Sequence, residues 1–244
     1  MTFSWEHVWT LRETGGRLRK VGRFLAARSD LQWIVYRELK ASGSVPPGGM
    51  ILEVGCGTAP VPGMLSKDSP NVFGIDVSPT AAAISSRVCI AAVADGRSLP
   101  FPSGTFDLVF STGVLDLYPM EQVRHFLGEM ERVLLPGGRA VVITSSRCAL
   151  HRAIMGRLLR TGEWKYGPKR EFVSLKDALT PGLDLVYERG RGAVFQLRFI
   201  SYLFDDNPFL RRAYHAFFLA VSLLLRPFNR LPGALLVTVM EKAE

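Results

Sequence analysis

The stretch from Ile51 to Pro60, ILEVGCGTAP, combines one carboxylate with two glycines. Glu53 stands inside an apolar, strand-like run, and Gly55 and Gly57 follow directly after it. Glycines let the backbone approach a ligand that a side chain would obstruct, and a following helix presents its free N–H groups to the same place. Glu53 suits a ligand that carries an ammonium or a sulfonium. The stretch therefore predicts a site for a small, positively charged cofactor.

A nicotinamide or flavin site would use the same kind of glycine loop, so the glycine pair alone is a weak signal. That dinucleotide fingerprint requires a third glycine at the position of Pro60. It also has no role for a carboxylate two residues before the first glycine. The sequence thus favours a cationic cofactor over a dinucleotide.

Strand-like and helix-like segments alternate through the middle of the chain. Strands are expected at 50–54, 72–75, 91–94, 106–111, 139–144, 184–188 and 235–240. Helices are expected at 79–86, at 121–134 before Pro136-Gly137-Gly138, and at 175–179 after Ser174. This alternation predicts an α/β fold, Rossmann-like and doubly wound, with a mostly parallel seven-stranded sheet and helical insertions.

Carboxylates also end the next two strands of this pattern. Asp76 ends the second strand, 21 residues after Gly55, and Asp95 follows the third. In open parallel sheets, ligands bind outside the carboxyl ends of the strands. A carboxylate in the place of Asp76 can accept both hydroxyls of a ribose. Both acids could instead simply cap the ends of their strands.

These segments, ILEVGCGTAP, VFGIDVSPTAA, AVADGRSLPFPSGTFDLVFSTGVLDLY and ERVLLPGGRAVVIT, occur in this order. Together they resemble the class I S-adenosylmethionine-dependent methyltransferases, in particular the broad group of quinone and small-molecule methyltransferases (type 11). The resemblance covers residues 50–145 strongly, and 174–189 and 234–242 weakly. It implies an enzyme with S-adenosyl-L-methionine as cofactor and S-adenosyl-L-homocysteine as product.

The resemblance implies a role for each matching residue near the methionine end of the cofactor. The glycine loop would form the wall around the methionine moiety: Gly55, Cys56 and Gly57. Glu53 would be oriented toward the ammonium group, and backbone oxygens of Ser111 and Thr112, at the end of the fourth strand, would face the same moiety. Cys56 can also be read as a small packing residue.

At the nucleoside end, the resemblance makes Asp76 the ribose ligand and lets Val77 stack against the adenine. Asp95 would accept from the adenine amino group, with Gly96 beside it. One departure from the family pattern is Ala59, which stands where the family has its third glycine and precedes Pro60.

Catalysis places few demands on this chain. Methyl transfer is an in-line displacement, so holding the reactants in line supplies much of the rate, and a base is needed only if the acceptor must lose a proton. Asp116, where the family often has a histidine, and Tyr118 are the candidate catalytic residues; Asp116 could also be a helix cap or a partner for a basic substrate. Other candidate bases are His7, His151 and Tyr166. No metal-binding pattern is present in the sequence.

The domain organisation follows from where the resemblance ends. Residues 1–45 are expected to form a helical substrate or lid segment, and 46–244 the methyltransferase domain. Insertions at 145–172 and 190–233 depart from the family core and are expected to determine the substrate.

The net charge of +8 is concentrated in two segments. Residues 1–40 and 190–233 each carry an excess of four positive charges. Such segments can meet phosphates, an anionic membrane or an acidic substrate, or can be ordinary solvated surface. The stretch 147–170 is also basic, but its helical apolar spacing indicates an amphipathic helix, and nucleic acid is not favoured.

The run 213–225 is apolar and bracketed by arginines. Thirteen helical residues span about 20 Å, less than the roughly 30 Å of a bilayer core, so an interfacial helix, a lid or a dimer interface is expected. Three widely spaced cysteines and an N-terminus without a signal-peptide core indicate the cytoplasm. The interfacial reading of 213–225 would add peripheral membrane contact, whereas the lid reading would not.

The sequence thus predicts a methyltransferase for an apolar or amphiphilic small molecule, such as a quinone, a lipid, an isoprenoid or an aromatic natural product. The alternatives are an RNA or protein methyltransferase and a non-catalytic, cofactor-binding partner protein.

Overall fold

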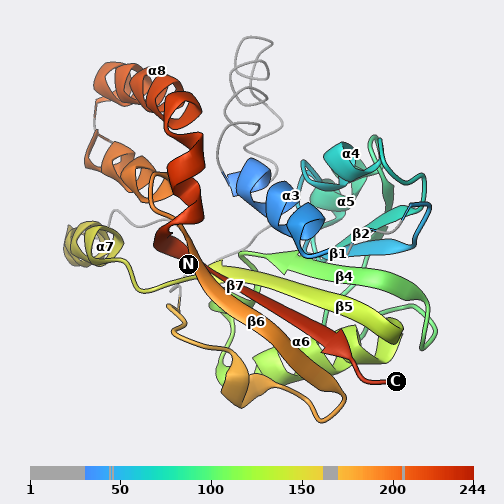
Figure 1. Cartoon of the computed structure of the whole chain (residues 1–244). Helices are drawn as coiled ribbons and strands as arrows, with labels where there is room; N and C mark the ends of the chain where they lie inside the picture. The colour runs from blue at the N-terminus through green and yellow to red at the C-terminus, as the bar shows by residue number, and fades with distance from the viewer. Residues whose placement is uncertain (1–30, 44, 46, 162–169, 205–206) are drawn as a thin grey trace.

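A seven-stranded sheet forms the centre of the computed structural model, which describes residues 31–43, 45, 47–161, 170–204 and 207–244. The strand order is β3-β2-β1-β4-β5-β7-β6. The strands are β1 (Ile51–Val54), β2 (Val72–Asp76), β3 (Ile90–Val93), β4 (Phe106–Thr112), β5 (Leu134–Ser145), β6 (Leu183–Gly192) and β7 (Pro232–Lys242). Only β7 runs antiparallel to its neighbours, β5 and β6. The predicted α/β fold with a mostly parallel seven-stranded sheet is confirmed (Figure 1).

Helices connect the strands and cover the sheet. The α-helices are α3 (Leu31–Ala41), α4 (Pro62–Leu65), α5 (Pro79–Ser85), α6 (Met120–Val133), α7 (Ala149–Thr161) and α8 (Pro208–Leu224). The 3-10 helices are η1 (Leu115–Leu117), η2 (Lys176–Ala178), η3 (Phe195–Phe204) and η4 (Arg226–Arg230). Local chemistry fixes several ends: the Ser78 hydroxyl accepts the Ala81 N–H at 3.1 Å to start α5, and Asn207 caps α8 in the same way.

Two apolar cores lie on opposite faces of the sheet. On one face, the helical spacing of α6 buries Val123, Phe126, Leu127, Met130 and Val133. On the other face, α3 and α4 supply the buried side chains. Successive residues of a strand point to opposite faces, so along β1 Leu52 belongs to the α6 core and Ile51 to the α3 core. Figure 1 shows α3 and α6 on these opposite sides.

Several boundaries differ from the sequence-based expectation, and β5 and β7 are both longer than predicted. α6 ends at Val133, because Leu134 already has extended backbone angles, and Pro136-Gly137-Gly138 therefore lies inside β5. The expected helix at 175–179 is the short 3-10 turn η2, with the Ser174 hydroxyl accepting the Lys176 N–H at 3.1 Å. β6 also extends to Gly192, well beyond the predicted 184–188.

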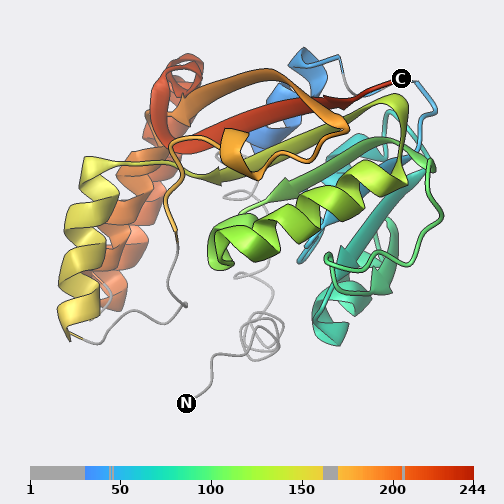
Figure 2. The ribbon, with the colours of Figure 1, turned by 90° about the horizontal axis from the view of Figure 1, so that it is seen from below.

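A helical layer beside the sheet contains the described parts of the segments 145–172 and 190–233. η3 packs against both α7 and α8, and the Tyr214 hydroxyl of α8 donates to the Leu197 carbonyl at 2.6 Å. Figure 2 shows this layer from below, with α7 and α8 at the same end of the sheet. No helix in the described part of the chain is long and apolar enough to cross a membrane. Of the predicted N-terminal segment, 1–30 and 44 lie outside the described residues.

Candidate active site

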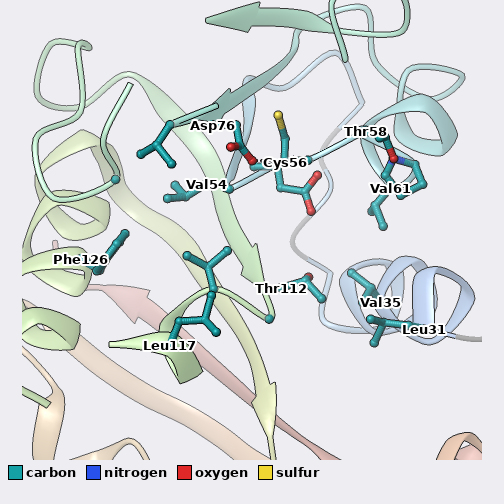
Figure 3. Close-up of a pocket in the computed structure, with 18 of the residues that line it drawn as sticks. Leu31, Val35, Val54, Cys56, Thr58, Val61, Asp76, Thr112, Leu117 and Phe126 are labelled. Carbon is teal, nitrogen blue, oxygen red and sulfur yellow. Dashed lines mark hydrogen bonds between the residues drawn. The ribbon is translucent and has the colours of Figure 1, made fainter. Parts of the chain in front are cut away.

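A cavity of about 240 Å³ opens at the carboxyl ends of β1, β2 and β4. The loops after β1 to β4 line it together with α3 and one side chain of α6, Phe126. The strand order reverses between β1 and β4, which is where doubly wound folds bind their ligands. Leu31 and Val35 of α3 lie across the cavity from Cys56 and Asp76 (Figure 3).

The glycine loop after β1 has the backbone conformation that its residue types predict. Gly55 has a φ of +76° and Gly57 a φ of +54°, both in the left-handed region that favours glycine. A Cβ at Gly55 would overlap Cγ2 of Val114. Gly55 is therefore required both by its backbone conformation and by the lack of space for a side chain. Ala59 also has a positive φ, +48°, in the place of the family's third glycine. The alanine thus keeps the glycine-like conformation at some cost in strain.

Glu53 lines the cavity and is almost fully buried, with 4% of its surface exposed. Its Oε2 has no hydrogen-bond partner among the described residues. Burial, and secondly the nearby Asp76 charge, hold the pKa of the Glu53 carboxyl well above its usual range. A buried carboxylate without a partner is costly. A cation in the cavity would remove this cost.

Asp76 ends β2 inside the cavity, and its carboxylate already organises the surrounding backbone. Oδ2 accepts the Gly57 N–H at 2.9 Å, and Oδ1 accepts the Ser78 N–H at 3.0 Å. A carboxylate has about four acceptor positions, and Asp76 presents its carboxylate at the cavity wall. Val77, next along the chain, is 48% exposed at the cavity, which leaves its side chain open to a planar ring.

Asp95 differs from the expectation. Arg97 donates to both of its carboxylate oxygens, with the closest contact at 2.6 Å, and this hydrogen bonding lowers the Asp95 pKa. Asp95 is not among the residues that line the cavity, whereas Gly96 is. A Cβ at Gly96 would overlap the Phe126 ring, so close packing explains this glycine. A role for Asp95 toward a ligand would require it to share its oxygens with Arg97.

Ser111 and Thr112, at the end of β4, have different positions. The Ser111 hydroxyl donates to the Val54 carbonyl at 2.8 Å, and the side chain is buried away from the cavity lining. Thr112 lines the cavity, and its buried hydroxyl has no partner in the part of the chain that is described. Ser111 thus joins β1 to β4, while Thr112 offers a polar atom to a ligand.

Cys56 behaves as a packing residue as well as a wall of the cavity. Its thiol lies within 3.5 Å of the Ser85 hydroxyl, and a Cβ at Gly74 would approach its Sγ to 2.9 Å. Burial is the largest cause of the raised pKa of the Cys56 thiol, followed by the Glu53 charge. The thiol therefore stays protonated near neutral pH and is a poor nucleophile.

Only one of the two candidate catalytic residues lines the cavity. Asp116 is fully buried, its Oδ2 accepts the Ser145 hydroxyl at 2.6 Å, and it does not line the cavity, which argues against the predicted contact with substrate. Tyr118 does line the cavity, but burial raises its pKa, which makes it a poorer base near neutral pH. His151 pairs with Glu171 at 3.1 Å, away from the cavity. His7 and Tyr166 lie outside the described residues.

Sequence reasoning missed the apolar side of the cavity. It is formed by side chains from α3, η1, α6 and the loops after β1 and β4: Leu31, Val35, Val61, Val114, Leu117 and Phe126. Their spacing indicates burial but cannot show whether a helix faces a core or a cavity. The described residues of α7, η3 and α8 do not line the cavity, so a lid role for this layer has no support in the cavity lining. Within the described ranges, no cluster of acidic, histidine or cysteine side chains is arranged for a metal ion.

Comparisons with known proteins agree with this geometry. Residues 52–142 match the model of a methyltransferase domain family. The chain is 37% identical over 106 residues to 2-methyl-6-phytyl-1,4-hydroquinone methyltransferase of Synechocystis, covering 41% of this chain and 33% of that protein. It is 34% identical over 141 residues to demethylmenaquinone methyltransferase of Thermus thermophilus, covering 54% and 62%. A probable tRNA methyltransferase 9B of Bos taurus is 35% identical over 98 residues, covering 39% and 21%.

A solved structure supports the fold. Geranyl diphosphate C-methyltransferase of Streptomyces coelicolor, in complex with Mg²⁺, geranyl diphosphate and S-adenosyl-L-homocysteine, has a TM-score of 0.57 at 14% identity. The match covers 86% of this chain and 76% of that one. The chain spans less than two thirds of the length of the curated relatives described above.

The fold and the cavity at its switch point define the Rossmann-like class I architecture. With the match over 52–142, they show a class I S-adenosylmethionine-dependent methyltransferase domain in this part of the chain. The residues present fit the cofactor of that class, because Glu53 has a buried, unpartnered carboxylate oxygen and the cofactor carries a sulfonium and an ammonium.

Proposed function

We propose that this chain transfers the methyl group of S-adenosyl-L-methionine to an apolar or amphiphilic small molecule. The observation that carries the proposal is Glu53, a buried carboxylate in a cavity at the switch point of the sheet, with an oxygen that lacks a partner among the described residues. A cationic ligand supplies the missing partner, whereas a pyrophosphate would be repelled. The quinone methyltransferases among the relatives support the small-molecule class.

In this proposal each cavity residue has one task. Glu53 and the Thr112 hydroxyl hold the ammonium end, and the left-handed loop at Gly55 and Gly57 surrounds the methionine moiety. Asp76 accepts from the ribose, and Val77 covers the adenine. Asp95 reaches the adenine only by sharing its oxygens with Arg97, and Ser111 acts indirectly by joining β1 to β4.

The cofactor, when bound, supplies an activated methyl group on a sulfonium. The chain's own part is to orient the acceptor and to exclude water, which can provide several kcal/mol through proximity. Leu31 and Val35 on one side, with Tyr118 and Phe126 on the other, form the apolar surfaces that would do this. An apolar acceptor such as a quinone, lipid, isoprenoid or aromatic natural product suits these walls.

We further propose that α8 meets a membrane surface. Leu210, Phe217 and Leu224 recur at intervals of seven residues and are 46%, 62% and 79% exposed, which gives α8 an unpartnered apolar face. Arginines stand near both ends of the helix, at the level where headgroups would lie. The alternative is an interface with a second copy of the chain, which oligomeric state in dilute solution would test.

The reaction can be tested with S-adenosylmethionine that carries a labelled methyl group. The full chain would be incubated with a total cell extract, which would then be separated into organic-soluble, RNA and protein fractions. The proposal expects label in the organic-soluble fraction, with less of it for Glu53→Gln. Label in the RNA or protein fraction would favour those alternatives, in line with the tRNA methyltransferase relative. Binding of the cofactor without any labelled product would favour a non-catalytic partner protein.

A further inference from the structure

A second hollow lies on the other side of α3 from the cofactor cavity. It has a volume of about 260 Å³ and is enclosed by α3, β6 and η4. Leu31 and Val35 of α3 face the cofactor cavity, whereas Trp33 and Arg37 face this second hollow. The two cavities share no lining residue, so the second is a separate site.

The lining of this hollow is strongly basic. It contains five arginines and one carboxylate, that of Glu38: Arg37, Arg189, Arg191, Arg226 and Arg230. Arg37 belongs to the basic segment 1–40, and Arg191, Arg226 and Arg230 belong to the basic segment 190–233. The fold thus brings Arg37 of the first basic segment beside three arginines of the second around one hollow. Like charges held this close repel one another, and an anion would relieve that repulsion.

Protein contacts already fix much of this arginine cluster. Glu38 is 6% exposed and accepts from Nε of Arg191 at 2.7 Å and from Nη2 of Arg189 at 2.7 Å. The Arg226 guanidinium lies 5.0 Å from the centre of the Trp33 ring. These contacts hold the guanidinium groups in place before any ligand arrives, which lowers the cost of binding.

Two of the arginines remain available. Among the described residues, neither Arg37 nor Arg230 has a side-chain hydrogen bond or an ion pair, although the Arg230 carbonyl accepts from Arg191 at 2.8 Å. Arg37 is half-buried and Arg230 is exposed, so one lies within the hollow and the other at its rim. A guanidinium matches the oxygens of a phosphate with paired N–H donors.

Exposed apolar side chains flank the arginines of η4. Leu224 is 79% exposed, Phe228 is 53% exposed and Leu231 is 53% exposed, and each stands within two residues of Arg226 or Arg230. A free anion would need only the charged hollow. A molecule with a phosphate and an apolar part would use both features at once.

We propose that the hollow between α3, β6 and η4 is a binding site for the phosphate headgroup of an anionic phospholipid at a bilayer surface. In this arrangement the phosphate enters the arginine hollow, while Leu224, Phe228 and Leu231 reach the boundary between headgroups and acyl chains. The inference rests on the membrane contact proposed for α8 and does not rest on methyl transfer.

Co-sedimentation of the full chain with vesicles tests this proposal. Vesicles of phosphatidylcholine with phosphatidylglycerol would be compared with vesicles of phosphatidylcholine alone. The test variant is Arg37→Gln/Arg230→Gln. The matched control, Arg87→Gln/Arg124→Gln, removes the same charge from exposed positions after α5 and on α6, outside both the hollow and α8. Leu210→Ser/Phe217→Ser reports on the α8 contact separately. Thermal unfolding of each variant checks that it is folded.

The proposal expects the wild-type chain to prefer the anionic vesicles. Each arginine near an anionic surface contributes about fivefold in affinity, so the hollow variant should lose at least about tenfold and the control much less. Equal losses of vesicle affinity in the two arginine variants would mean that the positive charges act only through diffuse electrostatic attraction, which would refute a specific site in the hollow. Loss of vesicle binding only in the serine variant would support the α8 membrane contact and would refute the hollow as a phosphate-binding site.

A titration with inorganic phosphate separates a lipid from a soluble anion. The proposal expects inorganic phosphate to bind far more weakly than the vesicles. The opposite result would be a chain that binds inorganic phosphate through Arg37 and Arg230 but sediments with neither kind of vesicle. That result would assign the hollow to a soluble phosphate and would contradict the proposed phospholipid site. S-adenosylhomocysteine affinity should be unchanged in the hollow variant, so the cofactor site is tested independently.

Discussion

The carboxylate of Asp76 accepts the backbone N–H of Gly57 at 2.9 Å, so the acid that ends β2 holds the glycine loop that follows β1. Its other oxygen accepts the N–H of Ser78, which caps α5. One side chain therefore organises two loops around the cavity. This arrangement explains why a carboxylate is needed here even before any ligand is considered.

Replacing Asp76 with alanine should weaken S-adenosylhomocysteine binding. The change removes charge-assisted hydrogen bonds and releases the Gly57 loop, which predicts a loss of about tenfold to a hundredfold in affinity. Isothermal titration calorimetry measures it, with the exposed Asp184→Ala as control. Unchanged affinity in both Asp76→Ala and Asp95→Ala would refute the proposed nucleoside contacts.

Glu53 predicts a particular dependence of stability on pH. Its pKa is raised in the folded chain by burial and then by Asp76, so above its ordinary pKa the folded state binds a proton that the unfolded state has lost. The stability of the ligand-free chain should therefore fall as pH rises from the ordinary pKa toward the raised one. Glu53→Gln should flatten this decline in thermal unfolding scans.

The same substitution should weaken ligand binding. Glu53→Gln removes the negative charge opposite the proposed ammonium, which predicts at least about tenfold lower affinity for S-adenosylhomocysteine. We therefore expect Glu53→Gln to be more stable than the wild-type chain near neutral pH and to bind S-adenosylhomocysteine less well. Tighter binding in Glu53→Gln would contradict the assigned role.

Gly55 should tolerate no side chain. Gly55→Ala places a Cβ against Val114 at a φ of +76°, so backbone strain and overpacking add. Gly137→Ala is the matched control, since its φ is +72° but no atom lies within 4 Å of the new Cβ. We expect the control to cost about 1–2 kcal/mol and Gly55→Ala to cost about 1–3 kcal/mol more in the free energy of unfolding. Equal losses in urea unfolding would show that the contact with Val114 is unimportant.

Substitutions at Tyr118 and at Asp116 should have different effects on cofactor binding and on stability. Tyr118→Phe keeps the aromatic wall, so S-adenosylhomocysteine affinity should be unchanged, whereas Tyr118→Ala should lower it. Asp116→Asn disturbs the buried bond to Ser145 and should lower the midpoint of thermal unfolding without changing that affinity. If Asp116→Asn folds normally but binds S-adenosylhomocysteine less well, Asp116 contributes to the cofactor site, contrary to this prediction.

The fold could be predicted because its signals are local and periodic. Alternating strands and helices, with α6 showing one apolar face, indicated the mostly parallel, seven-stranded sheet. The position of Pro136-Gly137-Gly138 was predicted wrongly, because a turn signal does not say whether the chain has already entered the strand. The glycine loop, Glu53 and Asp76 came from residue types at fixed spacings, and all of them line the cavity.

The rest of the site depends on tertiary contacts that no local pattern contains. Asp95 pairs with Arg97, and Asp116 turns toward Ser145, choices that depend on side-chain geometry. Residues 1–45 were expected to form a substrate or lid segment, but the sequence could not show which side chains of α3 face the site, since its apolar residues divide between a core and a cavity. The hollow likewise brings Arg37 close to Arg226 and Arg230, which lie about 190 residues further along the chain.

The central claim is that the cavity beside Glu53 holds S-adenosylmethionine and not a dinucleotide. Isothermal titration calorimetry of the wild-type chain with S-adenosylhomocysteine, NAD and NADP tests it most directly. The account predicts binding of S-adenosylhomocysteine at one site per chain and no heat of binding with either dinucleotide, because a buried carboxylate opposes a pyrophosphate. Binding of NAD or NADP, with none of S-adenosylhomocysteine, would contradict it.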